Sequence, residues 1–220
     1  MKKSLAKVLV IAPHADDEAL GCGGTIIKHK KAGDQVAVCI ITKPHFPDWS
    51  QEYIDNRIKE IQNAKETLKV DQTFQLDFKA AQIDSVAHKD LNKAIGDVIA
   101  QFEPEIIYIP YGKDLHKDHQ LVFVSCLVAC RYRAIKILAY ETLSETDIYP
   151  TFSEFFPNVY INVTEEMQDK IKAMQCYPSE VKAWPHPRSL EAIKICAQKR
   201  GSESGCDFAE AFVLIKEIKR

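Results

Sequence analysis

The residues best suited to chemistry form a cluster near the start of the chain, Ala12-Pro-His-Ala-Asp-Asp-Glu18. The cluster puts one imidazole and three carboxylates within five residues. Carboxylates this close repel one another unless a cation or a proton lies among them. We therefore expect a metal ion at this point of the chain.

A second cluster, Asp114-Leu-His-Lys-Asp-His119, carries two more imidazoles and two more carboxylates. His116 and His119 are three positions apart, so on a helix they would share one face. Taken alone, each cluster has a simpler explanation. Acidic residues often compensate the helix dipole in a first turn, and a His-x-x-His pair is often a surface or capping feature.

The elements around the clusters favour a shared metal site over these simpler explanations, because both clusters directly follow strand-like apolar runs. Strand patterns cover Lys7–Ile11, Val36–Thr42, Thr73–Phe78, Glu105–Pro110 and Lys136–Tyr140, and helix patterns cover Ala19–Lys31, Gln51–Leu68, His88–Phe102 and His116–Arg131. This alternation predicts an α/β fold with a Rossmann-like, doubly wound, mainly parallel sheet. In the common strand order 3-2-1-4-5, the first and fourth strands are neighbours, and a crevice opens at their carboxyl ends.

The last third of the chain has a looser pattern. It predicts a short strand at 158–163, a helix from Thr164 to about Cys176, a helix over Ser189–Lys199 followed by a Gly/Ser loop, and an apolar run at 211–218. No linker or repeat interrupts the chain, so we expect residues 1–220 to form a single domain.

The predicted topology brings His14, Asp17 and His119 within reach of one ion. Two histidines and one carboxylate with an open fourth position are typical of a hydrolytic zinc site, although iron or cobalt also fits these ligands. Zinc would lower the pKa of its bound water to ~7 and polarise a carbonyl group. Asp16, adjacent to Asp17 but pointing elsewhere, could take the proton from that water.

Composition excludes several other classes of protein. The net charge of -2 and the lack of a long basic block argue against nucleic-acid binding, and no apolar stretch approaches the ~20 residues of a membrane span. The basic start of the chain lacks a cleavage site, and the seven cysteines form no Cys-x-x-Cys pair. We therefore expect a cytoplasmic protein with reduced, packed thiols. Gly21-Cys-Gly-Gly24 fails as a dinucleotide fingerprint because Ile26 replaces the third glycine.

The two clusters together resemble the two signatures of the LmbE/PIG-L deacetylase family. Further similarity in Arg57-x-x-Glu60-x-x-x-Ala64-x-x-x-Leu68, Glu141–Thr146 and Phe208–Phe212 extends the resemblance nearly from end to end. That family consists of zinc-dependent enzymes that remove acetyl groups from N-acetylated amino sugars and their conjugates. The resemblance implies the same fold and reaction, one Zn²⁺ per chain, and a small-molecule N-acetyl sugar or sugar conjugate as substrate. It also implies a homo-oligomer, since family members often form trimers or hexamers.

The resemblance also assigns roles to individual residues. His14, Asp17 and His119 match the metal ligands, Asp16 the general base, His116 the group that polarises the carbonyl or protonates the leaving amine, Asp118 a partner that orients a histidine, and Arg57 a residue that binds substrate oxygens. For Arg57, a solvated helix face is the alternative. The chain departs from the family at Ala15 and Lys117, where proline is usual, and neither position supplies a ligand.

Several alternatives stay open at this stage. The chain could instead be an amidase of a larger sugar conjugate, or a zinc- or carbohydrate-binding protein without turnover. Asp16 favours catalysis, because a binding protein has no use for a carboxylate aimed at the water. The roles of His45, His186 and Glu210 are undecided: His45 lies in a loop, Lys43–Trp49, whose Phe46 and Trp49 could face a sugar ring or simply anchor that loop.

Overall fold

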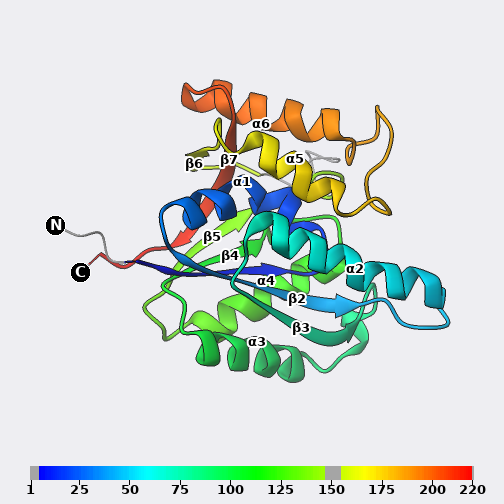
Figure 1. Cartoon of the computed structure of the whole chain (residues 1–220). Helices are drawn as coiled ribbons and strands as arrows, with labels where there is room; N and C mark the ends of the chain where they lie inside the picture. The colour runs from blue at the N-terminus through cyan, green and yellow to red at the C-terminus, as the bar shows by residue number, and fades with distance from the viewer. Residues whose placement is uncertain (1–4, 147–154, 220) are drawn as a thin grey trace.

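The computed structural model describes residues 5–146 and 155–219, so the first four residues of the basic start lie outside it (Figure 1). The described strands form one seven-stranded sheet in the order β3-β2-β1-β4-β5-β7-β6. The predicted α/β class and the predicted order 3-2-1-4-5 are therefore confirmed, with two further strands beyond β5.

The first five strands are parallel, and the last two run antiparallel to their neighbours. The strands are β1 (Lys7–Ala12), β2 (Gln35–Lys43), β3 (Gln72–Lys79), β4 (Ile106–Pro110), β5 (Lys136–Tyr140), β6 (Val159–Asn162) and β7 (Ala209–Lys216). β1 lies between β2 and β4, and residues 8–12 are completely buried because both faces of the sheet are covered.

Helices cover both faces of the sheet, and the buried apolar side chains form one cluster on each side. One face carries α1 (Asp17–Lys31), α2 (Gln51–Leu68), α5 (Met167–Gln175) and α6 (Leu190–Ser204), and the other carries α3 (His88–Phe102), α4 (Lys117–Cys130) and a short 3₁₀ helix at Ile83–Ser85 (Figure 1). α1 and α4 follow β1 and β4, so both begin at the same edge of the sheet.

The predicted Gly/Ser loop after residue 199 is wrong, because α6 continues to Ser204. Gly201 is buried in its last turns, where a Cβ atom would lie 2.5 Å from the carbonyl oxygen of Cys206. The helix ends only at Gly205, which has a left-handed backbone with φ 78°. The first glycine serves close packing and the second ends the helix.

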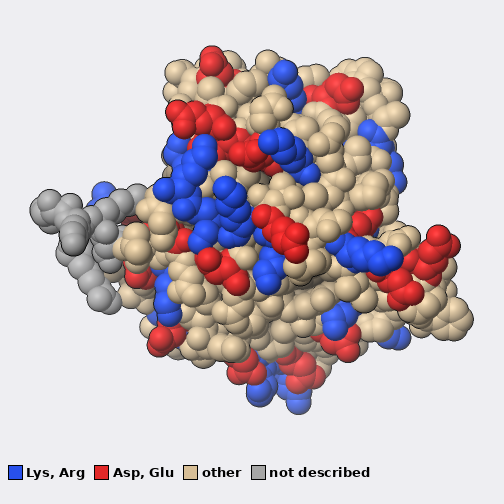
Figure 2. All heavy atoms as spheres, viewed as in Figure 1, with Lys and Arg blue, Asp and Glu red and all other residues tan. Residues whose placement is uncertain are grey.

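Among residues 5–146 and 155–219, no helix is both long and apolar enough to cross a membrane. The face shown in Figure 2 carries basic and acidic side chains next to each other. Among the ion pairs of the described residues, Lys31 contacts Glu165 and Glu166. All seven cysteines are described and free, and those at positions 22, 39, 126 and 130 are buried in the core.

Candidate active site

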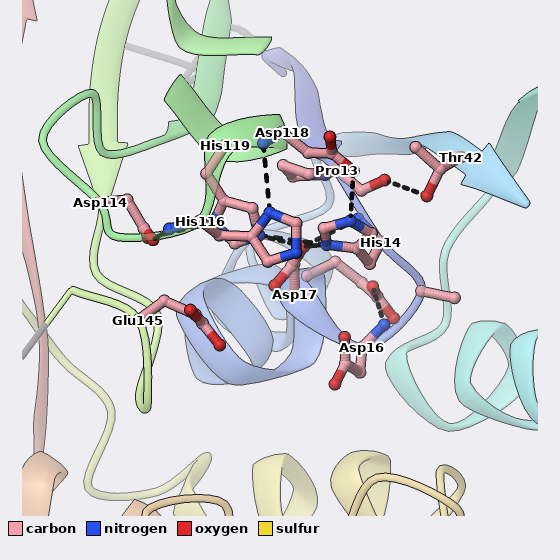
Figure 3. Close-up of polar contacts among 12 residues, drawn as sticks. Pro13, His14, Asp16, Asp17, Thr42, Asp114, His116, Asp118, His119 and Glu145 are labelled. Carbon is pink, nitrogen blue, oxygen red and sulfur yellow. Dashed lines mark hydrogen bonds and ion pairs between the residues drawn. The ribbon is translucent and has the colours of Figure 1, made fainter. Parts of the chain in front are cut away.

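The two clusters lie together at the carboxyl ends of β1 and β4 (Figure 3). The ring of His14 is 5.2 Å from that of His119 and 4.5 Å from that of His116, measured between centroids. His14 comes from the β1–α1 loop, and His116 is the N-cap residue of α4. Residues 105 positions apart in the chain are thus in contact because their strands are neighbours.

Three atoms of this group form a nearly equilateral triangle. Nδ1 of His14 lies 3.2 Å from Nε2 of His119, and Oδ2 of Asp17 lies 3.4 Å and 3.3 Å from those nitrogens. In a tetrahedral zinc site with bonds of about 2.0–2.1 Å, neighbouring ligand atoms are separated by about 3.3–3.4 Å. The triangle therefore has the size of one face of such a site.

The outer nitrogens of the same histidines face carboxylates. Nε2 of His14 lies 3.0 Å from Oδ2 of Asp118, and Nδ1 of His119 lies 3.1 Å from Oδ2 of Asp114. A carboxylate only accepts hydrogen bonds, so each outer nitrogen carries the hydrogen when the imidazole is neutral. The lone pairs of the two inner nitrogens and the carboxylate of Asp17 then all point at one position, as metal ligands do.

Burial and charge at this centre also favour a cation. Among the described residues, Oδ1 of Asp17 has no hydrogen-bond partner although it is completely buried. Burial lowers the pKa of His119, but the carboxylates of Asp17 and Asp114 outweigh it and raise that pKa well above its usual value. The carboxylates therefore favour a positive charge at this centre, which a divalent metal can supply in place of a proton. The residues fit such an ion.

His116 differs from the other two histidines. Its Nδ1 accepts a hydrogen bond of 3.1 Å from the backbone N–H of Asp118, so Nε2 carries the hydrogen of the neutral ring. Burial, followed by the neighbouring His14 and His119, lowers the pKa of His116 to about 4. One nitrogen from each of the three histidines lies within 4.8 Å of the others. The triangle that includes Asp17 is smaller and closer to zinc geometry.

Asp16 points away from the three imidazoles (Figure 3). Its φ of 127° is an unusual backbone angle for a residue with a side chain, and its N–H donates to Glu18, which also accepts from the hydroxyl of Tyr177. Oδ2 of Asp16 accepts a hydrogen bond of 3.0 Å from Nη1 of Arg188. Burial and the charge of Asp17 raise the pKa of Asp16 well above its usual value, although Arg188 opposes this shift.

A cavity of about 190 Å³ opens in front of His14, Asp16 and His116. Arg57 lines it, but this guanidinium is largely buried and engaged with the carbonyl of Ala15, the hydroxyl of Tyr53 and the carboxylate of Glu180. The cavity is also lined by Trp49 and Arg188, whereas Phe46 is 73% exposed. Arg57 is thus a buried wall residue, and the alternative of a solvated helix face is wrong.

Three residues of this site were not singled out from the sequence. Asp114 contacts His119, Arg188 contacts Asp16, and Glu180 joins Arg57 to Arg188. Asp114 belongs to the second cluster, so its spacing from His119 was a usable signal. Arg188 and Glu180 lie in an irregular segment without any periodic pattern.

The structure gives the three undecided residues local partners. His45 contacts the carbonyl of Lys43 and Asp77, and His186 accepts from the N–H of Arg188 within the turn. Glu210 is buried and accepts from the N–H groups of residues 24 and 25 and from the ammonium of Lys170. Glu210 therefore ties β7 to the middle of α1, which carries Asp17.

A sequence profile described as "PIG-L: GlcNAc-PI de-N-acetylase" matches residues 9–130, which is more than half of the chain. The chain belongs to the PIG-L family. The matched range contains both clusters, so the similarity to this family extends over residues 9–130 and is not limited to the two motifs.

The chain is similar in sequence to two deacetylases and in fold to a hydratase. The chain is 34% identical to the "Uncharacterized deacetylase YaiS" of Escherichia coli K12, over 72% of this chain and 83% of that protein. It is 26% identical to the diacetylchitobiose deacetylase of Thermococcus kodakarensis, over 96% and 84%. The crystal structure of GalB, a 4-carboxy-2-hydroxymuconate hydratase from Pseudomonas putida, superposes with a TM-score of 0.78, 18% identity and coverage of 98% of each chain. The fold thus also carries a different reaction, and the function has to be argued from the site.

Proposed function

We propose that this protein is a zinc-dependent hydrolase that removes the acetyl group from an N-acetylated amino sugar or its conjugate. The observation that carries the proposal is the triangle of His14, Asp17 and His119 with Asp16 beside it. Two deacetylase relatives, 34% and 26% identical to this chain, support this reaction, whereas the hydratase on the same fold is 18% identical.

In this proposal His14, Asp17 and His119 hold the metal, Asp118 orients His14, and Asp114 orients His119. Zinc bound there would polarise the acetamide carbonyl and lower the pKa of a water molecule to about 7. The cavity in front of the site would hold the sugar, with Trp49 offering an apolar ring face.

One side chain carries the proton, and a second stabilises the developing charge. Asp16 accepts a proton from the attacking water while Arg188 holds its other oxygen in place. His116 donates a hydrogen bond from its Nε2–H to the carbonyl oxygen as negative charge develops there, and the ring keeps its proton. The carbon–nitrogen bond breaks, the water oxygen stays on the acetyl carbon, and Asp16 delivers its proton to the departing amine. The products are acetate and a free amino sugar.

The first test measures acetate released from a panel of N-acetyl sugars and conjugates by metal-stripped protein, with and without added zinc. We expect zinc-dependent acetate from at least one compound. If zinc binds at one ion per chain but no compound yields acetate, deacetylation of sugars is wrong. A larger amide substrate or a binding role without turnover would then take its place.

A further inference from the structure

A second hollow lies next to the cavity of the candidate site. It is a groove of about 870 Å³ between α2 and the residues that end and follow α5. Tyr53 lines both the groove and the cavity, so the two hollows adjoin at this side chain. A ligand too long for the cavity would pass this tyrosine and enter the groove.

One stripe of α2 lines the groove, formed by Tyr53, Asn56, Glu60, Asn63 and Thr67. The spacing alternates between three and four residues, so these side chains share one face of the helix. A helix face with this spacing is normally apolar when it packs against another part of a protein. Here it offers a phenol, two amides, a carboxylate and a hydroxyl. The stripe is suited to a polar ligand.

Hydrogen bonds hold the floor of the groove to the wall of the cavity. Glu60 is buried and accepts from the N–H (3.3 Å) and the hydroxyl (3.1 Å) of Ser179. Arg57, a wall residue of the cavity, lies 3.4 Å from the same carboxylate, and the hydroxyl of Tyr53 donates to Glu180 over 2.9 Å. The two hollows therefore share one bonded framework, and a ligand that spans them meets a preformed surface.

The exposed side chains at the rim of the groove indicate the chemistry of its ligand. Asn56 and Asn63 are exposed above the buried floor, and an amide both donates and accepts, which matches neighbouring hydroxyl groups of a sugar. Lys59 and Glu66 also line the groove, and their opposite charges give it no preference for an ion. A neutral polyhydroxylated group fits this surface best.

We propose that the groove binds a further sugar unit attached to the acetylated sugar, so that the enzyme acts on an oligosaccharide rather than on a free monosaccharide. This inference rests on the proposed deacetylase function. The acetylated unit would occupy the cavity beside Asp16, and the next unit would cross Tyr53 and contact Asn56 and Asn63.

The test compares kcat and KM for N-acetylglucosamine and for its β-linked dimer and trimer. The double variant Asn56→Ala with Asn63→Ala removes both amides, and the matched control Gln101→Ala with Gln198→Ala removes two exposed amides from α3 and α6, away from the groove. We expect the first variant to raise KM for the dimer and trimer about tenfold, from two lost hydrogen bonds. KM for the monosaccharide and kcat for all three should not change, and the control should behave as the wild type.

A loss of activity on the monosaccharide as large as that on the trimer would overturn the inference, and so would an unchanged KM for the trimer. Calorimetric binding of the trimer to an Asp16→Asn protein separates this inference from the deacetylase function, because it requires no turnover. Trimer binding that the two asparagine substitutions weaken would support the groove even if no sugar released acetate. Absence of trimer binding, or a change of self-association in sedimentation, would show that the groove does not bind a sugar.

Discussion

Replacing Asp114 with asparagine is expected to weaken metal binding while the protein stays folded. Oδ2 of Asp114 accepts from Nδ1 of His119 over 3.1 Å and from the hydroxyl of Thr146 over 3.0 Å, and Oδ1 accepts from the N–H of His116 over 2.9 Å. Asparagine has the same shape but no charge, and its NH₂ group faces one of these donors. His119 would lose the partner that fixes which of its nitrogens points at the metal.

The size of the effect follows from the hydrogen bond that is weakened. A bond to a charged group contributes about 1.5–3 kcal/mol and a neutral one about 0.5–1.5 kcal/mol, so the loss is about 1–2 kcal/mol. At 1.4 kcal/mol per factor of ten, the zinc dissociation constant should rise roughly 5- to 30-fold. Measured losses of such partners, at about 10- to 100-fold, overlap this range.

The assay is a competition titration of zinc against a chromophoric chelator, with urea unfolding to show that the variant remains folded. Asp34→Asn is the matched control, because Asp34 is a buried carboxylate that contacts another histidine, His29, over 2.7 Å. The reasoning is refuted if Asp114→Asn binds zinc within twofold of the wild type. It is also refuted if the control weakens zinc binding equally.

Three further predictions concern the base, the packing and the pH dependence. Asp16→Asn should keep zinc but lower kcat by roughly 10²–10⁴-fold, because the proton acceptor is lost; normal turnover would show that the base is another group. Gly21→Ala should cost about 1–3 kcal/mol of unfolding free energy in urea, since a Cβ would lie 2.2 Å from the tyrosine ring at the end of β5. Gly96→Ala, in the middle of a helix with nothing within 4 Å, should instead stabilise by about 0.5–1 kcal/mol, and equal effects would contradict the packing argument. Burial raises the pKa of Asp71, but the hydrogen bonds from Lys30 and from the N–H of Val36, together with the charge of Lys30, outweigh it and lower that pKa below its usual value. Because the pKa is lower in the folded state, Asp71 stabilises the fold above pH ~4, and this contribution is lost as the pH falls through the folded value. The stability difference between the wild type and Asp71→Asn, at most about 1 kcal/mol for this partly exposed pair, should therefore shrink from pH 7 to pH 3 in urea titrations. A difference that grew would contradict the sign.

The sequence predicted the elements with strong periodicity well. The structure has α2 at Gln51–Leu68, α3 at His88–Phe102 and β5 at Lys136–Tyr140, as predicted. By contrast, α1 starts two residues earlier than predicted, at Asp17. The helix pattern begins at Ala19 in the sequence, whereas Asp17 and Glu18 already form the first turn of α1, where the dipole favours negative charge, as the simpler explanation of this cluster implied.

The meeting of the two clusters could be predicted because the strand order of doubly wound sheets is general. The contact of Arg188 with Asp16 could not, since the two residues are 172 positions apart and no repeating pattern links them. Arg188 comes from the irregular segment before α6, where local turns and tertiary contacts set the path of the chain without a periodic pattern. Periodic patterns in the sequence predict helices and strands, whereas the position of an irregular segment depends on contacts with residues far away in the chain.

The last third of the chain completes the charge balance of the site. Arg57, Glu180, Arg188 and Asp16 follow one another in contact, so positive and negative side chains alternate through the wall of the cavity. Each of these charges is largely removed from water, and removing one would leave its neighbour buried without a partner, at a cost of several kcal/mol. Because each of these four charges contacts an oppositely charged neighbour, a neutral sugar can displace water from the cavity without leaving any of them unpaired. The proposed base belongs to the first cluster of the chain, but the arginine that holds it lies in the last third. Both parts are therefore needed for the carboxylate of Asp16 to face the substrate in a fixed position.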